Sequence, residues 1–297
     1  MNTTERIKVK RVNKKINSEI FGIALFLIST LFALFISFYL QAVPEIANES
    51  SGISFVFVLY YIIFIVIFTA AALYIVKKHA GVMKIVFLIL VLYMIFLVAS
   101  IIAGIVAVNL TEYYLIIGVI TVFFAYMLIF RNEWYVTDAA GVIMISGAAG
   151  ILGILLRPEI AITLLVVFAV YDYIAVYKTK HMVTLARAAV DNQFPLMFML
   201  PSSKNLKMKD LTFENRGDQS IIMLGFGDMA IPEILIVSSF IYNPAHSILF
   251  AVLTLAGAIG ALIFLFFFSR GKPAPGLPFI NTGAIIGFLV AFSIIMI

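Results

Sequence analysis

Two aspartates stand inside long apolar segments of the chain, where an acid is least expected. Asp172 follows Tyr171 in one segment, and Asp228 ends the sequence Gly225-Phe226-Gly227-Asp228 in the next. A carboxylate in the hydrocarbon layer of a bilayer costs roughly 3 kcal/mol on insertion scales, so such a residue is a functional candidate by default. Two acids in successive apolar segments therefore define the first candidate site.

The chemistry open to this pair is acid–base hydrolysis. If the two segments are antiparallel spans, Asp172 and Asp228 lie roughly 8 and 12 Å from the same membrane face. A facing pair would share one proton, so that the ionised acid activates water while the protonated acid polarises a carbonyl group. Gly225 and Gly227 would let another backbone approach Asp228, and Tyr171 could donate a hydrogen bond beside Asp172.

A second class of function uses the same acids. Paired intramembrane carboxyls also bind and release protons or cations, so a proton- or cation-coupled transporter is the alternative. Glu233, five residues after Asp228, keeps this alternative open. The chain has no cysteine and no His-Glu-x-x-His sequence, and we therefore expect neither a metal site nor a cofactor.

Composition places the chain in the membrane. Of its 297 residues 64% are hydrophobic and only 12% are charged, which excludes an ordinary water-soluble globule. The net charge of +5 comes from basic residues beside apolar segments, where lipid headgroups and topology explain them. We expect a multi-pass protein whose environment is the lipid bilayer, with no nucleic-acid partner.

The apolar runs predict an all-α fold with nine transmembrane helices. Arg157-Pro158-Glu159 separates the fifth run from the sixth, because proline breaks a continuous helix. Each run is long enough for a helix to cross a bilayer. The predicted spans are Ile20–Leu40, Ile53–Val76, Ile85–Val108, Tyr113–Phe130, Val136–Leu156, Ile160–Tyr177, Ser220–Tyr242, Ser247–Phe268 and Leu277–Ile297.

The distribution of basic residues predicts the orientation. With the N-terminus inside, nineteen of the twenty Lys and Arg residues fall in cytoplasmic segments, and only Arg157 lies outside. We therefore expect a cell-membrane protein with a cytoplasmic N-terminus and an external C-terminus.

Three parts follow from this arrangement. Residues 1–177 hold the first six spans and Asp172, residues 178–219 form a cytoplasmic loop, and residues 220–297 hold the last three spans and Asp228. Within the loop, Leu206 to Phe213 alternates apolar and polar residues as a half-buried strand does. Before the last span, the prolines of Pro275-Gly276-Leu277-Pro278 exclude ordinary helix and expose backbone groups to an extended ligand.

These residues together resemble a known family. A Tyr-Asp span, a Gly-x-Gly-Asp span and a Pro-Ala-Leu turn before the ninth span are the signature of the presenilin and signal peptide peptidase intramembrane aspartyl proteases. The chain resembles a compact prokaryotic member, and we expect an archaeal one. It departs from the pattern in having Gly276 where the family has Ala, a change between small residues that should retain the turn.

The resemblance implies a function and assigns roles to residues. Asp172 and Asp228 would be catalytic, and Pro275, Gly276 and Leu277 would bind substrate, with Tyr171, Gly225 and Gly227 in support. The substrates would be transmembrane helical segments of peptides or proteins, including signal peptides. An oligomer is possible, and the sequence leaves it open.

Overall fold

The computed structural model describes residues 3–42, 55–131, 133–179, 181–201, 221–269 and 274–296. Helices account for nearly all of this part of the chain, which confirms the all-α class, and one short two-stranded sheet is the exception. The elements in chain order are α1 (Thr3–Gln41), α3 (Phe55–Val106), α4 (Leu110–Tyr126), η1 (Met127–Arg131), α5 (Trp134–Leu155), α6 (Pro158–Tyr173), η2 (Ile174–Lys178), α7 (His181–Asp191), β1 (Met197–Pro201), β2 (Ile221–Gly225), α8 (Phe226–Tyr242), α9 (Ser247–Ser269) and α10 (Gly276–Met296).

Seven helical segments among the described residues are long and apolar enough to cross a membrane. Each corresponds to one of the predicted spans. The seven are Ser18–Gln41, Gly81–Val106, Leu110–Arg131, Trp134–Leu155, Pro158–Lys178, Ser247–Ser269 and Gly276–Met296. The predicted spans Ile53–Val76 and Ser220–Tyr242 fall on the first half of α3 and on β2 with α8, so the count of nine is not confirmed by length and composition alone.

The predicted helix Ser220–Tyr242 is wrong over its first part. Ile221–Gly225 forms strand β2, and helix α8 begins only at Phe226. The run Ile221-Ile222-Met223-Leu224 favours strand because it contains β-branched residues, and it pairs with the apolar residues Met197–Pro201 of β1. The predicted strand Leu206 to Phe213 lies outside the described residues.

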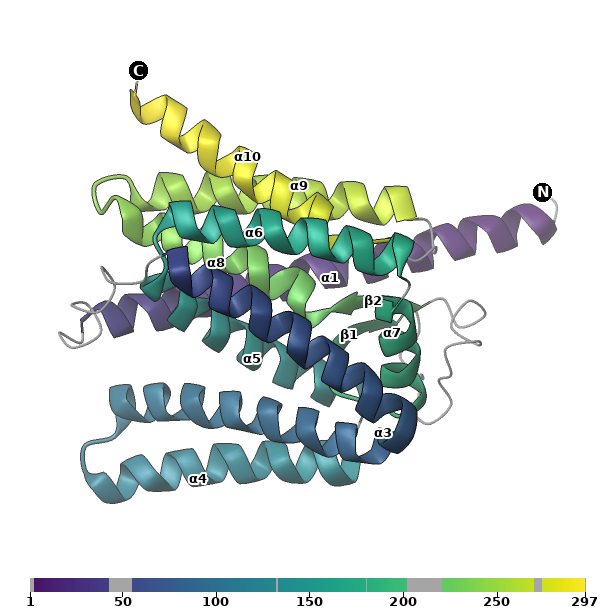
Figure 1. Cartoon of the computed structure of the whole chain (residues 1–297), viewed down its shortest axis with the longest axis horizontal. Coiled ribbons are helices and arrows are strands. Elements are labelled where there is room, and N and C mark those ends of the chain that lie inside the picture. The colour runs from purple at the N-terminus through teal and green to yellow at the C-terminus, as the bar shows by residue number, and fades with distance from the viewer. Residues whose placement is uncertain are drawn as a thin grey trace.

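The helices run back and forth between two ends of the molecule (Figure 1). α3 reverses direction at His79, where φ is −147° and ψ is 67°, so its two halves form a helical hairpin. The start of α1, helix α7 and the sheet lie at one end, whereas the C-terminus lies at the other. The tight turn predicted at Arg157-Pro158-Glu159 is confirmed, since α5 ends at Leu155 and Pro158 opens α6.

Helix α8 is the centre of the packed bundle. All eight residues from Pro232 to Ser239 are buried, as expected for a helix surrounded on every side. It is in contact with α1, α5, α6, α9 and α10. By contrast, α4 lies at the edge beside α3, with Ile117 as its buried residue. The helix that carries Asp228 is therefore the most enclosed element of the described bundle.

Small residues bring α9 and α10 together. A Cβ placed on Gly257 would strike the backbone carbonyl of Gly283, and one placed on Gly287 would strike that of Leu253. Small residues at such positions let two membrane helices approach closely. The contact fixes the position of α10, whose first turn reaches the two aspartates.

Candidate active site

Asp172 lies where regular helix gives way to a wider turn. It is the penultimate residue of α6 and is only 3% exposed. The following residues, Ile174–Lys178, form a π-helical turn, a distortion often found at functional sites because it loosens the backbone hydrogen-bond ladder. The hydroxyl of Tyr171 donates to Thr69 on α3 at 3.1 Å, so the expected neighbour of Asp172 tethers α6 to another helix.

Asp228 lies at the first turn of α8, immediately after the strand. It is the third helical residue, and its Oδ2 accepts a hydrogen bond from the backbone N–H of Gly225 at 3.3 Å. An acid at a helix N-terminus is favoured by the free N–H groups and by the helix dipole. The sequence places Asp228 eight residues into a helical span, whereas the structure places it at the junction of strand and helix.

The turn before α10 contacts both acids. The backbone N–H of Leu277 donates to Asp172 Oδ2 at 3.3 Å, and the N–H of Gly276 also interacts with that carboxyl. On the other side, a Cβ placed on Gly276 would lie 2.7 Å from Cγ and 2.8 Å from Oδ2 of Asp228. Asp172 and Asp228 therefore meet at a single backbone turn, and they lie close enough to interact electrostatically.

The glycines of the Gly225-Phe226-Gly227-Asp228 sequence differ in their surroundings. A Cβ on Gly225 would lie 3.2 Å from Asp228 Oδ2, so this residue packs directly against the acid. A Cβ on Gly227 would meet no described atom within 4 Å. The space beside Gly227 is thus available to an approaching backbone, as expected from its lack of a side chain.

The sheet beside Asp228 has a defined hydrogen-bond register. β1 and β2 are antiparallel with Met197 opposite Gly225 and Met199 opposite Met223. The N–H of Phe226 donates to the carbonyl of Leu196 at 3.1 Å. Because bonded and non-bonded pairs alternate in such a ladder, Ile221, Met223 and Gly225 direct their own backbone groups away from β1.

Three further polar residues of the bundle are buried, and of these the sequence singles out only Glu233. Asn281 Nδ2 donates to the carbonyl of Leu165 at 2.8 Å and so joins α10 to α6. Asp138 on α5 accepts from the N–H of Met199 at 2.9 Å. Glu233 accepts a hydrogen bond from Ser29 of α1, which places its carboxyl toward that helix. An acid or amide in an apolar run is the signal that points to Asp138 and Asn281 as well.

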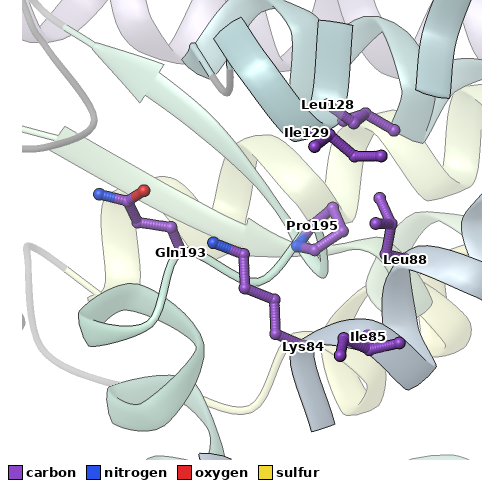
Figure 2. Close-up of a pocket in the computed structure, with 7 residues that line it drawn as sticks. All are labelled: Lys84, Ile85, Leu88, Leu128, Ile129, Gln193 and Pro195. Carbon is purple, nitrogen blue, oxygen red and sulfur yellow. The ribbon is translucent and has the colours of Figure 1, made fainter. Parts of the chain in front are cut away.

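A separate small pocket contains none of these acids. Figure 2 shows its lining, in which the amino end of Lys84 reaches toward Gln193, whose own amide group points away from it. Its volume is about 130 Å³, and the other walls are apolar side chains of α3 and η1. The candidate site is thus defined by the two carboxyls and the turn between them. Among the described residues, no group of three His, Cys, Asp or Glu side chains is placed to hold a metal ion.

Comparison with known proteins agrees with this arrangement. The family described as signal-peptide peptidase, presenilin aspartyl protease matches residues 23–297. Two solved structures of a presenilin family intramembrane aspartate protease, from C222 and P2 crystals, are each 26% identical to this chain. Each match covers 92% of this chain and 96% of the other, with TM-scores of 0.60 and 0.59. The comparison with curated proteins gave no match.

An apolar helical bundle of this kind, with these relatives, is an integral multi-pass membrane protein with the activity of an aspartic endopeptidase. The chain belongs to the signal-peptide peptidase and presenilin family of aspartyl proteases.

Proposed function

We propose that Asp172 and Asp228 form the catalytic dyad of this intramembrane protease. The observation that carries the proposal is the turn at Gly276-Leu277, which bonds to one carboxyl and packs against the other. Two acids held at one point can share a proton, and each then has a distinct task. The ionised acid takes a proton from water, while the protonated acid donates to the oxygen of the scissile carbonyl group.

The surroundings of the dyad favour one shared proton over two negative charges. In the described part of the chain, the one ion pair joins Arg157 to Glu159 at 3.4 Å, at the start of α6. No described cation is paired with either acid. Buried carboxylates without a positive partner are costly, so one neutral and one ionised acid is the favourable state. This is the protonation state that aspartic hydrolysis requires.

The proposed substrates are transmembrane segments of membrane proteins or signal peptides. A helix in lipid has all of its peptide groups bonded internally, so it must unwind before water can attack a carbonyl. Unwound substrate needs new backbone partners, and strand pairing provides them. The outward N–H and C=O groups of Ile221 and Met223 on β2 offer this pairing five to seven residues before Asp228.

The proposed topology retains nine crossings. The first half of α3 and helix α8 run between the two ends of the molecule in alternation with their neighbours (Figure 1). α8 has 17 residues, or about 25 Å of helix, which approaches the thickness of the hydrocarbon layer. With nine crossings, the N-terminus and the sheet lie on the cytoplasmic side of the cell membrane, and the C-terminus lies outside.

The experiment that tests this function measures cleavage of a purified membrane-spanning reporter in detergent. Asp172→Asn and Asp228→Asn should each abolish cleavage, because an amide can neither take up nor supply the shared proton. Asn281→Asp, which also alters a buried polar residue of α10, should keep measurable cleavage if only the dyad is essential. Cleavage by either dyad variant at more than a few per cent of the wild-type rate would refute the assignment.

The transporter alternative would use the same intramembrane acids, and the residue that keeps it open is Glu233. Its carboxyl bonds to Ser29 on α1, and family membership favours hydrolysis over transport. An ion-flux measurement on the same purified protein distinguishes the two functions, since the proposed protease should show none that depends on Asp172.

A further inference from the structure

Asp138 is a third acid within a membrane-spanning helix. It is the fifth residue of α5 and is 2% exposed. It has no role in the dyad, since the contacts of Asp172 and Asp228 are with the turn at Gly276-Leu277 and with Gly225. Burying a carboxyl costs free energy unless it is hydrogen-bonded. The hydrogen-bond partner of Asp138 therefore indicates its role.

The partner of Asp138 is the backbone of the sheet. Its Oδ1 accepts the N–H of Met199 at 2.9 Å, and its Oδ2 has no hydrogen-bond partner among the described residues. Met199 and Met223 are opposite each other in an antiparallel pair that exchanges no hydrogen bonds. The N–H of Met199 therefore points away from β2. Asp138 thus satisfies a buried N–H group on the outer edge of β1, a group that would be costly to leave bare.

The neighbouring packing makes this contact a fixed one. One turn after Asp138, Gly141 lies so close to Phe226 and Phe198 that a Cβ there would clash with the Phe226 ring. These two rings pack edge to face with centroids 4.8 Å apart, across β1 and the start of α8. α5 therefore holds β1 by one hydrogen bond and by the ring pair that adjoins Asp228.

The two edges of the sheet consequently differ. At Met199 the β1 edge is bonded to α5, whereas the β2 edge presents the outward groups of Met223 to an incoming strand. A continuous series of contacts runs from Asp138 through Met199 and β2 to Gly225, whose N–H bonds to Asp228. A shift of β1 would move this whole series relative to the dyad.

We propose that Asp138 is a positioning residue for cleavage: its carboxyl anchors β1 to α5, and this contact sets which substrate bond faces the dyad. The proposal rests on the proposed function, because it assumes that substrate pairs with β2 beside Asp228. Asp138 acts through the sheet and does not touch the reacting atoms. Its required property is a hydrogen-bond acceptor, which an amide oxygen also provides.

The test compares Asp138→Leu, which lacks an acceptor, with Asp138→Asn, which keeps one at nearly the same size. Cleavage by Asp138→Leu should fall about tenfold or more, the usual consequence of leaving a buried donor unpaired, and its cuts should spread to neighbouring bonds. Asp138→Asn should cleave within about threefold of wild type at the wild-type position. Thr137→Val is the matched control, because it alters the adjacent buried residue without removing the hydrogen bond to Met199. It should leave the cleavage rate and the cut position unchanged.

A second readout follows β1 itself and does not depend on proteolysis. The chain has no cysteine, so a single Met199→Cys substitution gives one thiol at a position that is 1% exposed. Maleimide should label this thiol slowly when residue 138 is Asp or Asn, and at least tenfold faster in the Asp138→Leu variant. If Asp172→Asn still cleaves, the proposed function fails, while this labelling still decides whether Asp138 anchors β1.

Three results would overturn the positioning role. The first is an equal labelling rate for Met199→Cys with Asp, Asn or Leu at position 138. The second is an unchanged cut position in an Asp138→Leu protein that labels rapidly, and the third is a loss of cleavage in Asp138→Asn as large as that in Asp138→Leu. If Asp138→Leu does not fold, Met199→Pro removes the same hydrogen bond from the other side and leaves the bonds between β1 and β2 intact. That variant should also spread the cuts, and wild-type cleavage by it would refute the role.

Discussion

The contact between Gly276 and Asp228 predicts a graded loss of activity as the side chain at position 276 grows. A Cβ there would lie 2.7 Å from Asp228 Cγ, about 0.7 Å short of the 3.4 Å at which ordinary contact begins. Either the carboxyl or the turn must move by that amount. Because Leu277 N–H is bonded to Asp172, a moving turn would disturb the other acid instead.

The expected magnitudes follow from this displacement. A misplacement of about 1 Å can cost roughly a hundredfold in rate, so Gly276→Ala should reduce kcat by up to about tenfold. Gly276→Val adds two further methyl groups in the same space and should reduce kcat by more than about a hundredfold. The family resemblance, with Ala at this position, agrees with Ala being the milder change. The sequence predicts only that a small residue at position 276 retains the turn, whereas in the structure the carboxyl of Asp228 is the nearest neighbour of a Cβ there.

The assay is cleavage of a purified transmembrane reporter, followed by quantitative mass spectrometry of the product. Gly260→Val on α9 is the matched control, since a Cβ there would meet no described atom within 4 Å. It should retain wild-type kcat and a similar thermal midpoint. If Gly276→Val cleaves within threefold of wild type, the close contact between this turn and Asp228 is refuted.

Three further predictions concern topology, the substrate strand and the tie between α10 and α6. Reporters fused to the two ends of the chain should lie on opposite sides of the membrane, with the N-terminal reporter in the cytoplasm. If both reporters lie on the same side, nine crossings are refuted. Met223→Pro should reduce cleavage of a helical substrate about tenfold, because it removes only an outward N–H of β2. An unchanged rate would show that substrate does not pair there. Asn281→Leu should lower the unfolding free energy by about 1 kcal/mol, because it removes the hydrogen bond between α10 and the Leu165 carbonyl, and thermal unfolding in detergent measures this loss. An unchanged midpoint would contradict this.

Local sequence patterns are enough to predict the class of the molecule and its candidate acids. Apolar runs of about twenty residues allow little other than membrane helices, since backbone groups in lipid must be bonded within their own segment. An acid inside such a run is costly, and so Asp172 and Asp228 stood out without a structure. The break at Pro158 was equally local, because proline cannot continue a helix.

How those residues meet depends on contacts between segments that are distant in the chain. Ile221–Gly225 is apolar enough for a helix, and it is a strand because β1, more than twenty residues earlier, supplies its hydrogen bonds. The turn at Gly276-Leu277 reaches both acids in a structure where α10 is held against α9 by close glycine contacts. Asp138 gained its partner in the same way, 61 residues away. Local sequence specifies which groups need a partner, but long-range packing brings one particular partner within reach.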